Sequence, residues 1–209
     1  MEYDSSCKDC ERLSFFLTQV KNKNPDYFCK PVPSFGKKNS PFLIVGLAPG
    51  MHGANKTGRP FTGDHAGILL YKALYKFGFS NQEKSQSISD NLILKNCRIT
   101  NAVKCLPPDN KPNHQEIKNC NKFLKSEISK LKHGSILLAL GLIAHNAIMT
   151  ALNLTKKEYK FSHGKRHILP NNLVMYDSYH CSRYNTQTKR LTEKMFHEVF
   201  LSIKTEMER

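Results

Sequence analysis

The stretch PFLIVGLAPGMHGANKTGRPFTGDHAGILLY, residues 41–71, indicates the fold of the whole chain. It begins with an apolar run, FLIV at residues 42–45, which is typical of a buried strand in an α/β sheet. A glycine-rich loop follows directly, and its backbone can turn sharply and approach a ligand closely. Polar side chains are interspersed in this loop: His52, Asn55, Lys56, Thr57, Arg59, Thr62 and Asp64. Because open α/β sheets bind ligands at the carboxyl ends of their strands, we expect a ligand site here.

This loop carries neither of the common phosphate-binding signatures. GLAPGM at residues 46–51 lacks a Gly-Lys-Ser/Thr ending, and no GxGxxG sequence precedes a helix. Nucleotide binding of those two kinds is therefore a weak interpretation. A structural Gly/Pro turn is the plainer alternative.

Further apolar runs alternate with helix-like segments along the chain. Strands are predicted at residues 97–103, 135–140 and 173–176, and helices at residues 68–77, 113–132, 142–152 and from residue 191 onward. Asn113 and Glu116 form a capping box at the start of one of these helices. Residues 159–169 read as a hairpin or an irregular arm. The pattern predicts one α/β domain over residues 1–209, a three-layer sandwich in which helices flank a central, mostly parallel sheet of four strands.

The charge balance favours a polyanionic partner. Lys and Arg number 32 against 17 Asp and Glu, which gives a formal net charge of +15 spread along the chain. An ordinary basic protein from an organism rich in Lys and Asn is the alternative. No apolar run is long enough to span a bilayer and the amino terminus does not resemble a signal peptide, so we expect a cytoplasmic monomer with no membrane partner.

Seven cysteines in a cytosolic protein indicate metal ligands and free thiols rather than disulfides. Cys7 and Cys10 form a CxxC sequence, and Cys105 and Cys120 are separated by fourteen residues. Four thiolates suit zinc or a 4Fe-4S cluster, and their spacing does not discriminate between the two. A redox CxxC is less compatible, because this one does not follow a strand.

A second loop, SYHCSRYNTQT at residues 178–188, follows the last predicted strand. Together with GLAPG at residues 46–50 and RPFTGD at residues 59–64, it resembles the motifs of family 5 of the uracil-DNA glycosylase superfamily. The resemblance runs from Cys7 to Thr192. One position departs from the family pattern, since Cys181 replaces a proline. We expect this change to make the loop more mobile and to expose a thiol to oxidation.

The resemblance implies a cofactor. Families 4 and 5 carry a 4Fe-4S cluster on an N-terminal CxxC and on two later cysteines that flank a Lys-Cys-x-Pro-Pro sequence like residues 104–108. The implied ligands are Cys7, Cys10, Cys105 and Cys120. The implied role is structural.

The resemblance also implies roles for individual side chains around a base flipped out of DNA. Phe61 would stack on the base, and the Asn101 amide would pair with the edge of uracil, which a cytosine would mismatch. His180 would stabilise the negative charge that develops on uracil O2, and Asp64 would orient water and stabilise the cationic sugar. An N-cap for the following helix is a second possible role for Asp64. Asp177 is a weaker second carboxylate.

Other residues are candidates for contacts around this pocket and along the DNA. Pocket contacts are expected from backbone and side-chain groups at Ala48, Gly50, His52 and Asn55. Arg183 and Tyr184 would replace the extruded base, and phosphate contacts are expected from Lys104, Lys111, Lys165 and Arg166.

The sequence therefore predicts a monofunctional glycosylase that hydrolyses the N-glycosidic bond of uracil in DNA and, as the resemblance implies, of other deaminated or modified bases such as hypoxanthine and hydroxymethyluracil. No lysine stands in the motifs as a Schiff-base nucleophile, which argues against a lyase. Two alternatives remain: a non-catalytic iron-sulfur protein that binds nucleic acid, and a hydrolase of free nucleotides or nucleosides on the same frame.

Overall fold

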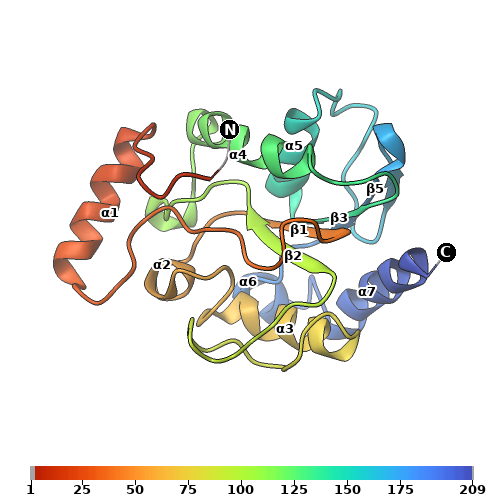
Figure 1. Ribbon diagram of the computed structural model, residues 1–209, viewed down its shortest axis with the longest axis horizontal. Helices are drawn as coiled ribbons and strands as arrows, with labels where there is room; N and C mark the ends of the chain where they lie inside the picture. The colour runs from red at the N-terminus through yellow and green to blue at the C-terminus, as the bar shows by residue number, and fades with distance from the viewer. Residues whose placement is uncertain (1–2, 209) are drawn as a thin grey trace.

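A five-stranded sheet forms the centre of the protein in the computed structural model, which describes residues 3–208 (Figure 1). The strand order is β2-β1-β3-β5-β4. The strands are β1 (Phe42–Gly46), β2 (Cys97–Asn101), β3 (Ile136–Leu140), β4 (Arg166–Ile168) and β5 (Val174–Ser178). Neighbouring strands pair in parallel except β4, which runs antiparallel to β5. The predicted α/β class is confirmed, and the strand count of four is corrected to five because part of the predicted arm forms β4.

Seven α-helices in the described part of the chain surround this sheet. They are α1 (Glu11–Lys23), α2 (Ala54–Thr57), α3 (His65–Lys76), α4 (His114–Ile128), α5 (Leu142–Ala151), α6 (Arg183–Gln187) and α7 (Glu193–Met207). Two short 3-10 turns span Pro108–Asn110 and Pro170–Asn172. No helix within residues 3–208 is both long and apolar enough to cross a membrane.

Alternating residues of each strand divide the core into two layers. Phe42 and Ile44 of β1 pack with α3 and α7 on one face of the sheet, whereas Leu43 and Val45 pack with α4 and α5 on the other. Figure 1 shows these two helix pairs on opposite sides of the sheet. The strands are buried on both faces, which explains why they appear in the sequence as continuous apolar runs.

Side chains at the helix starts fix where each helix begins. The predicted capping box of Asn113 and Glu116 is present at α4, with both reciprocal hydrogen bonds at 2.8 Å. Asp64 caps α3, Ser182 caps α6 and Thr192 caps α7. Two of these caps stand directly after the loops that follow β1 and β5, so the cap bonds also fix the ends of those loops.

The carboxyl ends of the four parallel strands lie along one edge of the sheet. The segments that leave this edge are residues 47–64 after β1, residues 102–107 after β2, Gly141 after β3 and residues 179–182 after β5. Motifs that are far apart in the sequence are therefore brought together at this edge.

Candidate active site

Three side chains from three strand ends converge at this edge. The Phe61 ring and the His180 imidazole lie face to face, with ring centroids 6.1 Å apart and planes inclined by 29°. A methyl group added at Gly46, the last residue of β1, would collide with both Asn101 Oδ1 and the Phe61 ring. Because Gly46 has no side chain, Asn101 and Phe61 can approach each other next to it, and a larger residue would not fit there.

Asn101 ends β2 and is almost completely buried, with 4% of its surface exposed. Its side-chain oxygen has no hydrogen-bond partner among the described residues. A buried amide oxygen without a partner is unfavourable by about 1–3 kcal/mol, which is tolerated where a ligand supplies the missing donor. The plainer interpretation, a strand-end Asn whose oxygen satisfies the backbone, does not account for this atom.

His180 follows β5 and is half-buried beside a cavity of about 270 Å³. Phe161, Tyr179 and Arg190 line the same cavity. Burial lowers the pKa of His180 to about 4, so its imidazole is neutral at pH 7. A neutral imidazole with one N–H can donate a hydrogen bond to an oxygen on which negative charge develops.

Asp64 lies three residues after Phe61, where it caps helix α3 and also lines a cavity. Its Oδ1 accepts the Gly67 N–H at 2.8 Å, so the N-cap role at α3 is confirmed. Burial raises the pKa of this carboxyl group, and the Gly67 N–H partly opposes the shift. Asp64 lines a neighbouring cavity of about 500 Å³, together with His65 and Arg183, rather than the cavity beside His180.

Cys181, which stands where the family motif has proline, is completely buried. Its burial and then the nearby Asp64 carboxylate raise the pKa of its thiol. The expected exposure of this thiol to oxidation is therefore wrong, because the side chain points into the core cluster that contains α3 and α7.

Of the predicted pocket residues in the glycine-rich loop, Gly50 lies near the site and His52 does not. Gly50 lies next to the catalytic candidate Asp64, whose Oδ2 is 3.7 Å from where a Gly50 Cβ would be. His52 is exposed and its Nδ1 is bonded to the Tyr27 hydroxyl at 2.7 Å, so it lies outside both cavities.

Two further loop positions pack inward. Asn55 is fully buried in α2, where its Nδ2 donates to Cys29 Sγ at 3.4 Å, and its Oδ1 has no partner in the described structure. Ala48 packs against the cysteine group described below. Neither side chain lines the cavity beside His180.

Lys104 does not point toward solvent, so the prediction of a phosphate contact by its side chain is wrong. Only 2% of its surface is exposed, its Nζ donates to Ser34 Oγ at 2.9 Å, and Glu127 Oε1 lies 3.5 Å away. Burial lowers the pKa of its ammonium group and Glu127 partly opposes this shift. Nothing in the sequence indicates the pairing, because Glu127 comes from α4, far along the chain.

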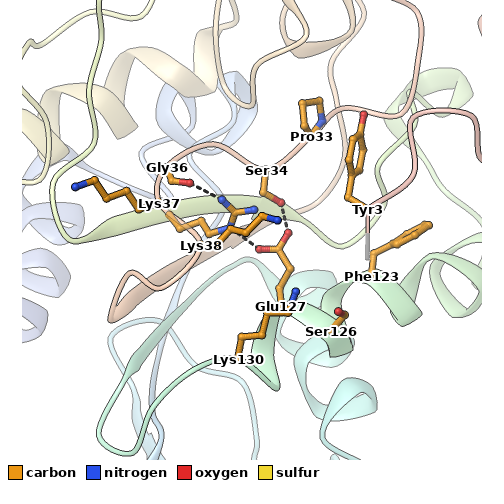
Figure 2. Close-up of a pocket in the computed structure, with 11 residues that line it drawn as sticks. Tyr3, Pro33, Ser34, Gly36, Lys37, Lys38, Phe123, Ser126, Glu127 and Lys130 are labelled. Atoms are coloured by element: carbon orange, nitrogen blue, oxygen red, sulfur yellow. Dashed lines mark hydrogen bonds and ion pairs between the residues drawn. The ribbon is translucent and has the colours of Figure 1, made fainter. Parts of the chain in front are cut away.

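The same carboxylate lines a cavity of about 450 Å³ (Figure 2). Figure 2 shows Glu127 reaching toward Ser34 between Tyr3 and the lysines at positions 37, 38 and 130. Arg98 Nε is bonded to Glu127 Oε2 at 2.7 Å. Because Arg98 is near the amino end of β2, this cavity is at the opposite end of the strand from Asn101 and does not belong to the candidate site.

The candidate residues for DNA contacts other than Lys104 lie on the surface. Arg183 and Tyr184 begin α6 and are exposed, with 69% of the Tyr184 surface accessible. Lys165 is exposed in the turn before β4, and Lys111 is exposed after the first 3-10 turn. Arg166 Nε forms an ion pair with Glu206 Oε2 at 2.8 Å, so the positive charge of Arg166 is balanced within the protein.

Four cysteines gather in one group at the side of the sheet. Cys7, Cys10 and Cys105 pack with Cys120 around Leu13, Val103 and Phe123. The Lys104 backbone N–H donates to Cys120 Sγ at 3.2 Å, and the Asn119 amide donates to Cys10 Sγ at 3.7 Å. Burial and then the neighbouring thiols raise the pKa of Cys105. The predicted grouping of these cysteines is thus present.

Sequence reasoning assigned no role to three residues around the site, of which Tyr179 and Arg190 lie in or beside the motif at residues 178–188. Phe161 and Tyr179 line the His180 cavity, and the Arg190 guanidinium lies 4.7 Å from the Tyr179 ring centroid. Asp177, predicted as a weak second carboxylate, is fully buried between His145 and His167. Only the position of Asp177 at a strand end could have indicated this group.

Comparison with known proteins places these features in a family. The family model described as "Uracil DNA glycosylase superfamily" matches residues 33–204. A "Type-5 uracil-DNA glycosylase" of Thermus thermophilus is 40% identical over 205 residues, covering 96% of this chain and 93% of that protein. One of Pyrobaculum aerophilum is 37% identical and covers 93% of this chain and 86% of that protein. A "Type-4 uracil-DNA glycosylase" of Sulfurisphaera tokodaii is 28% identical, with 93% and 79% covered.

Proposed function

The chain belongs to the uracil-DNA glycosylase superfamily, and from this premise we propose that it removes uracil from DNA by hydrolysing the N-glycosidic bond, leaving an abasic site. The observation that carries the proposal is the unpartnered Asn101 Oδ1 beside the Phe61 ring. A flipped uracil offers its N3–H to this oxygen and its O4 to the amide N–H groups of the same side chain. Cytosine presents a lone pair at N3 and a donor at N4, so it fits neither group.

Phe61 provides a platform for the base. Its ring is fixed on a backbone with φ of 55°, a conformation that is strained for an aromatic residue, and its exposed fraction is 6%. The tight turn through Thr62 and Gly63 is held by Arg59, whose Nε donates to Thr62 Oγ1 at 2.9 Å. The site is thus pre-organised, so little conformational entropy is lost when the base stacks.

His180 and Asp64 stabilise the two charges of the transition state. Breaking the N-glycosidic bond leaves negative charge on uracil and positive charge on the sugar. The neutral His180 donates to uracil O2, and its ring centroid lies 6.1 Å from that of Phe61, beside the place where the base would stack. The Asp64 carboxylate orients the attacking water and faces the cationic sugar. Water is the only nucleophile in this scheme, which makes the enzyme monofunctional.

DNA contacts are supported by exposure and charge. We propose that Tyr184 and Arg183 fill the space left by the extruded base and that Lys165 contacts a phosphate, since all three are exposed and Arg183 lines the cavity that contains Asp64. On the basis of the family resemblance, we also propose hypoxanthine and modified uracils as further substrates. The protein acts as a single-domain monomer in this proposal.

The cysteine group has the donor set of a 4Fe-4S cluster. Thiols from the N-terminal CxxC, from the segment after β2 and from α4 gather around Leu13, Val103 and Phe123, and thiolates are the ligands that such a cluster takes. We propose Cys7, Cys10, Cys105 and Cys120 as its ligands. The bound cluster would supply a cross-link between the N-terminal arm and the segment after β2.

A uracil-containing oligonucleotide tests the proposed activity. We expect the protein to convert each uracil into an alkali-labile abasic site in duplex or single-stranded DNA, and we expect Asn101→Ala to lose this activity by at least about 100-fold. Asn146→Ala on α5 is the matched control and should excise at the wild-type rate. Absence of abasic sites with uracil and with every deaminated base in a panel would refute the proposal, and tight DNA binding without excision would favour a binding protein.

A further inference from the structure

A buried cluster of three polar side chains connects three elements behind the candidate site. His145 of α5, His167 of β4 and Asp177 of β5 are 1%, 6% and 0% exposed. His145 Nδ1 lies 2.8 Å from Asp177 Oδ1, and His167 Nε2 lies 2.9 Å from Asp177 Oδ2. No motif and none of the proposed catalytic roles accounts for this cluster.

The acceptors around His145 determine its protonation. Its Nε2 lies 2.7 Å from the Tyr159 carbonyl oxygen, which can only accept, so this nitrogen carries a hydrogen. Its Nδ1 faces the Asp177 carboxylate, which also accepts when ionised. Asp177 Oδ2 receives two donors, His167 Nε2 and the Ser162 N–H at 3.3 Å. Every hydrogen bond is satisfied when one proton lies between His145 Nδ1 and Asp177 Oδ1. Because imidazole is a stronger base than a carboxylate, we assign this proton to His145, as an imidazolium ion with Asp177 as its carboxylate partner.

A metal ion is the alternative cation between these groups, because their ligand atoms lie within 4.8 Å of one another. In a tetrahedral site with bonds of about 2.0 Å, however, adjacent ligand atoms are roughly 3.3 Å apart. The separations of 2.8 and 2.9 Å are shorter than this and are those of charge-assisted hydrogen bonds. The geometry therefore favours a proton over a metal ion.

The ion pair holds the segment of residues 159–164 against the sheet. Tyr159 and Ser162 bind it through their backbone groups, and the Phe161 ring packs edge-on against the His145 ring with centroids 5.7 Å apart. The Gly164 N–H adds a bond to the Asp177 carbonyl oxygen at 2.8 Å. Both ends of this segment are therefore tied to His145 and Asp177.

This segment in turn forms part of the wall of the candidate site. Phe161 lines the cavity beside His180. His163 Nδ1 accepts the Tyr179 N–H at 3.1 Å, and the two rings stack with centroids 5.0 Å apart. Since Tyr179 directly precedes His180, a shift of the segment would reach the backbone that presents His180.

We propose that the buried hydrogen bond between His145 and Asp177, an ion pair in the wild type, is a positioning device that fixes Phe161 and the Tyr179–His180 backbone for base excision. Neither residue touches the base. The kinetic part of this inference rests on the proposed function, whereas the protonation of His145 and the order of the segment do not.

Two measurements on the resting protein test the inference without any activity. Nitrogen-15 NMR of labelled histidines should show hydrogens on both ring nitrogens of His145 at pH 7, and metal analysis should find no ion that depends on His145 or His167. Hydrogen exchange at the amides of Ser162 and Tyr179 should be slow in the wild type and faster in His145→Ala.

Asp177→Asn is a variant that keeps the hydrogen bonds of the cluster, so it distinguishes loss of positioning from loss of the fold. The amide introduced by this substitution can donate to a neutral His145 while its oxygen accepts from His167 and Ser162, so the segment stays in place. We expect this variant to excise uracil within about threefold of the wild-type rate, with His145 now carrying one hydrogen. His145→Ala should lower kcat by on the order of 10- to 100-fold, because displacements near 1 Å cost about that much. His133→Ala, at an exposed histidine, is the control and should change nothing.

Four results would overturn the inference: a singly protonated His145 in the wild type, a stoichiometric metal ion bound by the cluster, wild-type kcat and exchange rates in His145→Ala, or a loss in Asp177→Asn as large as in His145→Ala. If the wild type excises no base, the proposed function fails, and the spectra and exchange rates still decide the role of the ion pair.

Discussion

Gly53 supports the Asp64 carboxylate, and Gly53→Ala is a substitution that should displace it. A Cβ added at Gly53 would lie 2.5 Å from Asp64 Cβ, 2.6 Å from Oδ2 and 2.9 Å from Cγ. The predicted effect is that of the new methyl group on the Asp64 side chain, which it would contact at three atoms. At Gly50, in the same loop, an added Cβ would lie 3.7 Å from Asp64 Oδ2, an ordinary contact.

The size of the effect follows from the contact distance. Carbon atoms pack at about 3.5–4.0 Å, so the Asp64 side chain must withdraw by roughly 1 Å from the new methyl group. A displacement of about 1 Å in a catalytic group costs on the order of 100-fold in rate. The same movement weakens the cap bond to Gly67, which is expected to destabilise the fold by about 1 kcal/mol.

Single-turnover excision of uracil from an oligonucleotide measures this prediction, with unfolding in urea as a check on stability. Gly53→Ala should fall about 100-fold in rate while remaining folded, and Gly50→Ala should stay within about threefold of the wild type. Equal rates for the two variants would refute the reasoning, because they would show that excision does not depend on where Asp64 lies.

Three further predictions concern pH, the cysteine group and a buried ion pair. The pKa of His180 is about 4 in the folded protein and 6.5 in the unfolded chain, so the unfolded state takes up a proton first as the pH falls. The free energy of unfolding should therefore be highest above pH 6.5 and should decrease between pH 6.5 and 4, by no more than about 3 kcal/mol. Urea unfolding at pH 7 and pH 5 should show this decrease in the wild type and a smaller one in His180→Ala. The proposed cluster predicts that the protein carries iron with visible absorbance and that Cys105→Ser loses both, together with several degrees of Tm, whereas Cys97→Ser, at a buried thiol outside the group, should retain the iron. Arg59→Ala should destabilise the protein by about 3 kcal/mol in urea unfolding, since it leaves the Asp90 carboxylate without its partner at 2.6 Å, and an unchanged midpoint would contradict this.

The sequence predicted the fold class and the central convergence because each of those features is local. Strand β1 and its loop are adjacent in the chain, and so are β2 and Asn101, or β5 and His180. Parallel strands bring their carboxyl ends to one edge whatever the details of packing, so Phe61, Asn101 and His180 meet. The catalytic and binding roles of these residues remain predictions.

The features that the sequence did not predict depend on partners distant in the chain. In the sequence Lys104 precedes Cys105 and has the features of an exposed loop residue. Its pairing with Glu127 in the interior depends on how α4 packs, which the sequence does not indicate. β4 is three residues long and has one buried position, His167, which is too short for a periodic signal. His145 lies within an apolar helix, where a single histidine indicates nothing.

β4 also has a consequence for how the molecule behaves among its own copies. Sheets with long open borders tend to recruit another chain through backbone pairing, and proteins limit this by shortening or covering the outermost strand. Within residues 3–208, one border is β4, short and carrying Arg166 bonded to Glu206, and the other is β2, where Phe35 forms an antiparallel bridge to Ile99. Both borders are thereby protected, so a concentrated solution should remain free of strand-mediated aggregates.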